Sequence, residues 1–152
     1  MPFSKTKEHH TEDYWTRHFN LYLKPLIEKS GEFEAFRSEP LRGNIANQII
    51  TDLVNSDIVV CDLTDHNPNV LWELGVRQSF KHGNITIAEA GTQIPFDFNH
   101  KAVLFYNGEH LDNELFYQAF SAALADCIQH PEGPDSPVLE ALGGRGTLYS
   151  RP

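Results

Sequence analysis

Two acidic residues follow a short apolar run in the sequence, and acidic residues in such positions are typical of a ligand site. Asp62 follows the run Ile58–Cys61 directly, and Glu73 comes later, in a stretch with the character of a helix. In open α/β sheets, ligands bind beyond the carboxyl ends of the strands. One acid at that edge and another in the helix that leaves it could therefore both reach a bound ligand.

The local sequence predicts the elements that carry these acids. Ile58–Cys61 is rich in β-branched residues and too short for a helix, which indicates a buried strand. Pro68 suits the first helical position and Asn67 the N-cap, so a helix is predicted to begin there. A capping-box acid would stand at Val70, and capping therefore does not explain Glu73. A partly solvated surface carboxylate is the alternative interpretation of Glu73.

Composition and charge restrict the class of protein. The chain has 152 residues, enough for one domain with a hydrophobic core. Its net charge of −9 argues against partners that present phosphate backbones or anionic membranes, so neither nucleic acid nor membrane is expected. No apolar stretch could cross a bilayer and no signal peptide is recognisable, which predicts a cytoplasmic protein.

Metal chemistry is not expected from the sequence. Cys61 and Cys127 have neither zinc nor redox spacing, and they are interpreted as free buried thiols. His9 and His10 are adjacent and cannot share one face of a helix. We therefore predict no metal site.

The remaining chain alternates between strand and helix patterns, which predicts a parallel sheet with helices on both faces. Residues 1–129 are expected to form the domain, and 130–152, with several prolines and glycines, a loosely ordered tail. The other predicted strands are 32–37, 85–88 and 102–106; the other predicted helices are 12–30 with a kink at Pro25, 45–53 capped by Asn44, and 111–129.

The central stretch carries a resemblance. S-D-I-V-V-C-D-L-T-D-H-N-P-N-V-L-W-E-L-G at 56–75, with M-P-F-S at 1–4, the 31–37 segment and I-P-F-D at 94–97, resembles the bacterial TIR-like and nucleoside 2-deoxyribosyltransferase-like proteins, often linked to anti-phage defence. The likeness covers about residues 1–128. It implies a flavodoxin-like open parallel sheet whose first strand is missing or truncated here. A longer protein, another start site, or another segment or chain would then supply that strand.

The resemblance also implies an activity. Such proteins act at the N-glycosidic carbon of a nucleotide or nucleoside; in TIR members NAD is the substrate and nicotinamide leaves, while the transferases exchange a base. The family's glutamate matches Glu73, which would stabilise or capture an oxocarbenium-like state. NAD enters as a substrate and no cofactor is implied. A homo-oligomer, or a place within a longer sensor-effector protein, is expected.

Six further residues are expected to bind the substrate, of which five follow here and the sixth is Asp62. Phe3 and Ser4 match the loop that borders the family's nucleotide pocket. Arg37 could meet a phosphate, or be a plain surface cation. Thr64 belongs to the matched D-L-T segment. Trp72 could line the site or a partner surface.

Asp62 has two interpretations of similar weight. It could hold a ribose hydroxyl or raise the pKa of Glu73, or it could only end the strand and cap the following turn.

Three functions remain open. An NAD glycohydrolase that gives linear or cyclic ADP-ribose comes first, and a nucleoside 2-deoxyribosyltransferase or nucleotide N-glycosidase second. A non-catalytic TIR-type interaction module is the third. A phosphoacceptor receiver domain is set aside, because the expected acidic pair after the first strand has no counterpart in Pro2-Phe3-Ser4.

Overall fold

Three parallel strands form an open sheet. The computed structural model describes residues 1–2, 4–38, 45–94, 103–108 and 114–143. Within these, the strand order is β1–β2–β3, and Val60 of β1 pairs in register with Ile85 of β2. The strands are β1 Val59–Asp62, β2 Asn84–Glu89 and β3 Val103–Tyr106. They confirm the predicted strands at 58–61, 85–88 and, for its described part, 102–106.

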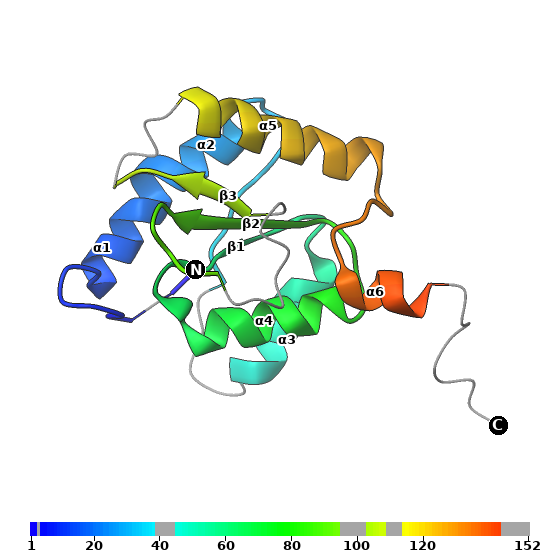
Figure 1. Cartoon of the computed structure of the whole chain (residues 1–152), viewed down its shortest axis with the longest axis horizontal. Coiled ribbons are helices and arrows are strands. Elements are labelled where there is room, and N and C mark those ends of the chain that lie inside the picture. Colours follow the sequence, from blue (N-terminus) through cyan, green and yellow to red (C-terminus); the bar gives the residue numbers. More distant parts are fainter. Residues whose placement is uncertain (3, 39–44, 95–102, 109–113, 144–152) are drawn as a thin grey trace.

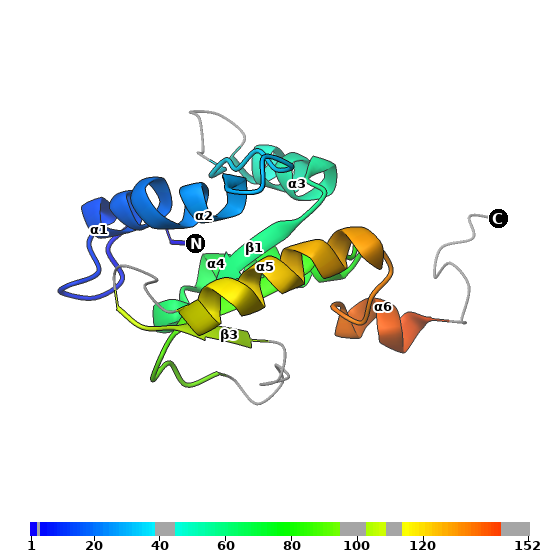
Figure 2. The same cartoon turned by 90° about the horizontal axis from the view of Figure 1, so that it is seen from above.

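Helices cover both faces of this sheet (Figure 1). One face carries α1 Glu12–Arg17, η1 His18–Leu23, α2 Lys24–Glu28 and α5 Glu114–Gln129. The other face carries α4 Pro68–Gln78, against which α3 Ile45–Asn55 and α6 Pro137–Leu142 pack. Seen from above, α1 and α2 lie beside α5 (Figure 2). The arrangement confirms the predicted α/β class and is consistent with a flavodoxin-like fold.

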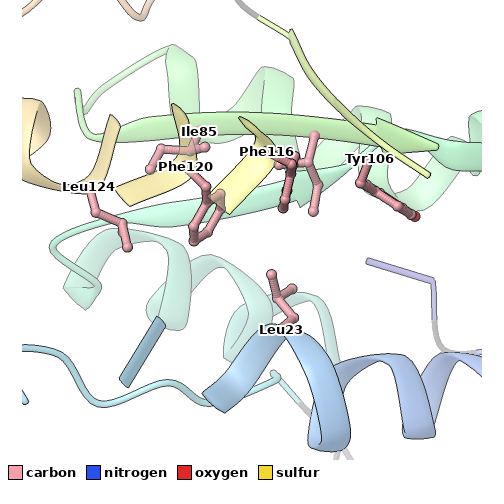
Figure 3. Packing of buried hydrophobic residues seen from close by; sticks show 7 residues of the cluster. Leu23, Ile85, Tyr106, Phe116, Phe120 and Leu124 are labelled. Atoms are coloured by element: carbon pink, nitrogen blue, oxygen red, sulfur yellow. The ribbon is translucent and has the colours of Figure 1, made fainter. Parts of the chain in front are cut away.

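The larger core cluster lies between the sheet and α5 (Figure 3). The rings of Phe116 and Phe120 stack with centroids 5.6 Å apart, and Leu23 reaches the cluster from η1. Each such fully buried side chain contributes about 1.5–3 kcal/mol. The cluster joins the helices of this face to the central strand through Ile85, Ile87, Tyr106, Phe116, Phe120 and Leu124.

The second cluster joins α4 to the opposite face. Val70 and Leu74 of α4 are buried against Cys61, Ala88 and Val103 of the three strands. These α4 residues are one turn apart, so they form the stripe that fixes the rotation of the helix. That rotation leaves the other faces of α4 free of the core.

The first helix is irregular directly before Pro25, where a kink was predicted. Residues 18–23 form a π-helix, in which the N–H of Lys24 donates to the carbonyl oxygen of Phe19. Pro25 then stands at the start of α2, where its missing N–H is tolerated. The wider π turn thus lies next to the predicted interruption of the helix, and the kink itself stays a prediction.

The predicted strand at 32–37 is wrong. The segment 33–38 is not paired with any described strand, although its burial alternates, with Phe33 and Ala35 inward and Glu34 and Phe36 outward. The residue pattern of a strand is thus present, but a strand also needs a neighbouring backbone to bond with.

The expected loose tail is also wrong for residues 130–143. These residues include α6, which packs against α4. The Asp135 carboxylate accepts hydrogen bonds from the N–H groups of Gly83 and Asn84 at 2.7 and 2.8 Å. Ser136 is buried and donates to the carbonyl oxygen of Gln78. Two polar side chains therefore anchor a segment that has little apolar content.

Arg77 joins the segments that lead into β1 and β2. Its guanidinium is fully buried and, among the described residues, donates only to backbone carbonyl oxygens, those of Leu53, Ser56, Asp57, His82 and Gly83. A Cβ at Gly83, whose φ is +81°, would lie 2.5 Å from the Asp57 carbonyl oxygen, so only glycine fits there.

Some expectations fall outside the described residues. These are the cap Asn44, residue 102 of the last predicted strand and residues 111–113 of the last predicted helix. Within the part that is described, no helix has the length and apolar character needed to span a bilayer.

Candidate functional site

Glu73 lies where the local sequence places it, on the second turn of α4. The Asn67 side chain caps this helix by accepting from the N–H groups of Asn69 and Val70, and Pro68 is its first residue. Because Val70 and Leu74 face the core, Glu73 falls on the flank of the helix and is half-buried. The predicted strand–loop–helix unit is confirmed.

A cavity of about 390 Å³ opens beside β1, and Glu73 lines it. We call it the edge cavity. Its walls come from β1 and the residues before it, from the unpaired segment 33–38, and from α3, η1, α2 and α5. Its apolar lining includes Phe19, Leu23, Ile27, Phe33, Leu53 and Val60.

Carboxylates dominate the polar lining of the edge cavity. The described lining residues include Glu32, Glu34, Asp52, Asp57 and Glu73. They include one guanidinium, Arg37, and the chain's first residue, Met1. The cavity is therefore acidic overall.

Burial raises the pKa of the Glu73 carboxyl above its ordinary value, while the nearby amino group of Met1 acts in the opposite direction. Among the described residues, no hydrogen bond or ion pair holds this carboxylate. A half-buried carboxylate without such partners is free to interact with a molecule in the cavity.

Arg37 is in the same cavity but is tied to the chain start. Its guanidinium donates to the carbonyl oxygen of Pro2 at 2.6 Å and to the hydroxyl of Thr16 at 3.3 Å. We had expected Arg37 at the end of a paired strand. It lies instead on the extended segment 33–38, which is unpaired among the described residues. Arg37 and Glu73 are the predicted site residues that line the edge cavity, among those that the structure describes.

Asp62 and Thr64 lie in the interior and do not line the edge cavity. One Asp62 oxygen accepts the N–H of Thr64 at 3.0 Å, and the other accepts the Tyr106 hydroxyl at 2.8 Å. The Nε2 atom of His18 lies 3.3 Å from the same oxygen, an ion-pair distance without hydrogen-bond geometry. Thr64 in turn accepts the N–H of Glu89.

Burial and contacts act in opposite directions on the Asp62 carboxyl. Burial raises its pKa, but the adjacent His18 imidazole and the bonds from Thr64 outweigh burial and hold the pKa below its ordinary value. Both carboxylate oxygens are occupied, which favours the interpretation that Asp62 ends the strand and caps the turn. Asp62 is also not among the groups that shift the pKa of Glu73.

The other predicted substrate-binding residues lie apart from the edge cavity or outside the described chain. Ser4 is exposed and does not line it. Trp72 of α4 is 48% exposed and does not line the edge cavity. Phe3 lies outside the described residues.

A buried polar cluster at the carboxyl ends of β1 and β2 was not predicted. His10 is buried, with Nδ1 on the Asp65 carboxylate and Nε2 3.5 Å from Glu89. Lys7 pairs with the other Asp65 oxygen at 2.7 Å, and the Thr6 hydroxyl donates to Asp65 as well. Burial raises the Asp65 pKa, but these partners outweigh it and lower the pKa.

The backbone beneath this cluster is unusual. Asp65 and His66 have φ values of 64° and 53°, in the left-handed region that disfavours side chains. The only sequence feature that could have indicated this cluster was the polar turn at 64–67. Its contacts with residues 6–10 could not be predicted, because these segments are distant along the chain. The cluster clamps the 5–10 loop onto the end of β1.

No group of three or more His, Cys, Asp or Glu side chains within the described ranges is arranged to hold a metal ion. No protein-family model, curated protein or solved structure matches the chain.

Proposed function

We propose that this chain cleaves an N-glycosidic bond, with Glu73 as the acting carboxylate and NAD as the substrate. The observation that supports this proposal is the state of Glu73. It is half-buried on the wall of a cavity, has no ion pair among the described residues, and carries a raised pKa. Perturbed carboxylates that face cavities are more frequent at functional sites than elsewhere.

The chemistry requires few other groups. Breaking the bond between ribose and nicotinamide builds positive charge on the sugar, and a carboxylate stabilises or captures that cation. Nicotinamide leaves as a neutral base, so no strong general acid is needed. The attraction between Glu73 and the sugar cation is stronger in a partly dehydrated cavity than in water.

Arg37 is the guanidinium that could meet a phosphate of the substrate. Its guanidinium donates to the Pro2 carbonyl oxygen and to the Thr16 hydroxyl, both of which are neutral groups. Arg37 and Glu73 line the same cavity, which supports the proposal that Arg37 meets a phosphate.

The acidic lining favours a second candidate, a nucleoside N-glycosidase or 2-deoxyribosyltransferase. NAD carries a diphosphate, which the surrounding carboxylates would repel. A nucleoside carries no phosphate and avoids that cost. The same Glu73 chemistry applies to both substrates.

The test is turnover of NAD and of a panel of purine and pyrimidine nucleosides, with the released base identified by chromatography and mass. Glu73→Gln is expected to lower the rate by at least about 100-fold, the usual size of the loss of one electrostatic group. Glu132→Gln, which changes an exposed carboxylate outside the cavity, should keep the rate.

Release of nicotinamide identifies the first candidate, and release of a nucleobase the second. Turnover that survives Glu73→Gln would contradict the role of Glu73. If no substrate is cleaved even at high protein concentration, the non-catalytic interaction module becomes the remaining candidate function.

A further inference from the structure

We propose that Asn107 and Gly108 form a site of spontaneous deamidation, at which the asparagine side chain is converted to a carboxylate without an enzyme. Asn107 is the one asparagine of the chain that is followed by glycine. The pair lies directly after β3, and both residues are exposed. This inference does not depend on the proposed chemistry of Glu73.

The reaction needs a backbone nitrogen close to a side-chain carbonyl carbon. The nitrogen of Gly108 gives up its proton to solvent and attacks Cγ of Asn107, and ammonia leaves as a succinimide ring closes. Water then adds to one of the two ring carbonyl carbons and opens the ring, which gives aspartate or isoaspartate. Each conversion therefore consumes one water and releases one ammonia, with no oxidation or reduction.

Both reacting groups are free of hydrogen bonds in the folded chain. No described residue accepts a bond from the N–H of Gly108, and none bonds to the side chain of Asn107. A Cβ built on Gly108 would have no atom within 4 Å, so the space beside the attacking nitrogen is open. Gly108 has a φ of +63°, in the left-handed region that glycine adopts without strain. The turn thus leaves the nitrogen accessible to the Asn107 side chain.

The strand that precedes the pair is firmly held. Tyr106 is fully buried, and its backbone carbonyl oxygen accepts the N–H of Ala90 at 2.7 Å. The register of β3 is therefore fixed up to Tyr106, and the chemical change falls on the exposed turn after it. Isoaspartate would add one carbon to the backbone of that turn. Either product adds a negative charge at the carboxyl end of β3.

Other asparagines lack this freedom. Asn55 is exposed, but the N–H of the following Ser56 donates to a carbonyl oxygen of α3 at 3.0 Å. Asn69 is also exposed, and the N–H of the following Val70 donates to the side chain that caps α4. A nitrogen whose N–H is bonded reacts only after local opening of the structure. These asparagines are therefore controls within the same chain.

The test is incubation of the whole folded chain at mildly alkaline pH, followed by peptide mass mapping. The peptide that contains Asn107 should gain about 1 Da as the amide becomes an acid. It should do so at least about ten times faster than the peptide that contains Asn55. A protein isoaspartyl methyltransferase should label the product, because ring opening gives isoaspartate, whereas direct hydrolysis of the side chain gives aspartate alone.

Asn107→Gln is the matched variant. It keeps an amide at the same exposed position, but its longer side chain must close a larger ring, so conversion at residue 107 should fall at least about tenfold. The urea-unfolded chain is the second comparison. Unfolding breaks the bond from the Ser56 N–H, so Asn55 should convert at least about tenfold faster, whereas the rate at Asn107 should change by less than about threefold.

Three results would overturn the proposal. The first is an Asn107 that stays intact in the folded chain but converts in urea, which would show that the fold protects the turn. The second is conversion of Asn55 in the folded chain as fast as that of Asn107. The third is a product that contains aspartate without isoaspartate, which would exclude the succinimide route.

Discussion

The Tyr106 hydroxyl of β3 donates to the Asp62 carboxylate of β1 at 2.8 Å, across the carboxyl end of the intervening strand β2. Both side chains are fully buried. Burial also raises the pKa of Tyr106, which keeps the hydroxyl proton available for this bond at all ordinary pH values. The bond therefore connects the two outer strands of the sheet.

Tyr106→Phe is expected to destabilise the fold by about 1–3 kcal/mol, because it leaves a buried carboxylate oxygen without its donor. Urea unfolding measures the change. Tyr117→Phe is the control: it removes a hydroxyl but keeps the ring on which Lys29 rests, and should change stability by less than about 0.5 kcal/mol. Similar losses in the two variants would contradict the importance of the bond.

Arg77→Lys is expected to cost at least about 2 kcal/mol, because one ammonium cannot reach the carbonyl oxygens that the guanidinium holds together. Thermal and urea unfolding of Arg77→Lys give the loss, and Arg17→Lys, at an exposed i,i+4 pair, is the control. An Arg77→Lys variant of unchanged stability would mean that these carbonyl groups find other donors.

Asp135→Asn should release residues 130–143 from the sheet before the rest of the protein unfolds. The change weakens the bonds to the Gly83 and Asn84 amides and removes the charge opposite His82. Hydrogen exchange should become faster in α6 while the amides of β2 beyond Ile85 stay protected. Asp126→Asn, which changes an exposed pair with His130, should leave α6 unchanged.

Glu73→Gln should stabilise the protein at neutral pH. The folded state raises the pKa of Glu73, so its contribution to stability is fully present below the ordinary value of 4.5 and is lost as pH rises through the raised pKa. Glutamine avoids that loss. The urea midpoint of the variant should therefore exceed that of the unmodified chain at pH 7, and the two should converge as pH falls below about 4.5.

Glu132→Gln provides the comparison, because an exposed carboxylate is not subject to the burial that shifts Glu73. Its midpoint should follow that of the unmodified chain at every pH. A variant Glu73→Gln that is less stable at pH 7 would show that the carboxylate has a stabilising partner.

Local signals were sufficient for the strand–loop–helix unit. The β-branched run, the Asn67 cap and Pro68 all act within a few residues, so they fix β1 and α4 whatever the rest of the chain does. They also placed Glu73 in the helix that follows the strand. The α/β class followed from the repetition of such units.

The errors concern contacts between distant segments. The 32–37 pattern is that of a strand, but pairing depends on a neighbouring backbone that sequence cannot locate. The burial of His10 depends on Asp65 and Glu89, and the docking of α6 depends on the bonds of Asp135 and Ser136. None of these partners is near in sequence, so neither hydropathy nor spacing could indicate them.

The π-helix of residues 18–23 has a consequence for the length of the chain. A π turn holds more residues than an α turn, so it is equivalent to an insertion that the helix has absorbed without breaking. Its position between the buried residues Trp15 and Leu23 keeps both on the core side. Losing one residue here would restore an ordinary α-helix with both side chains still on the core side, because residues seven apart share one face of an α-helix. The two halves of the first helix thus keep the same phase with or without the extra residue.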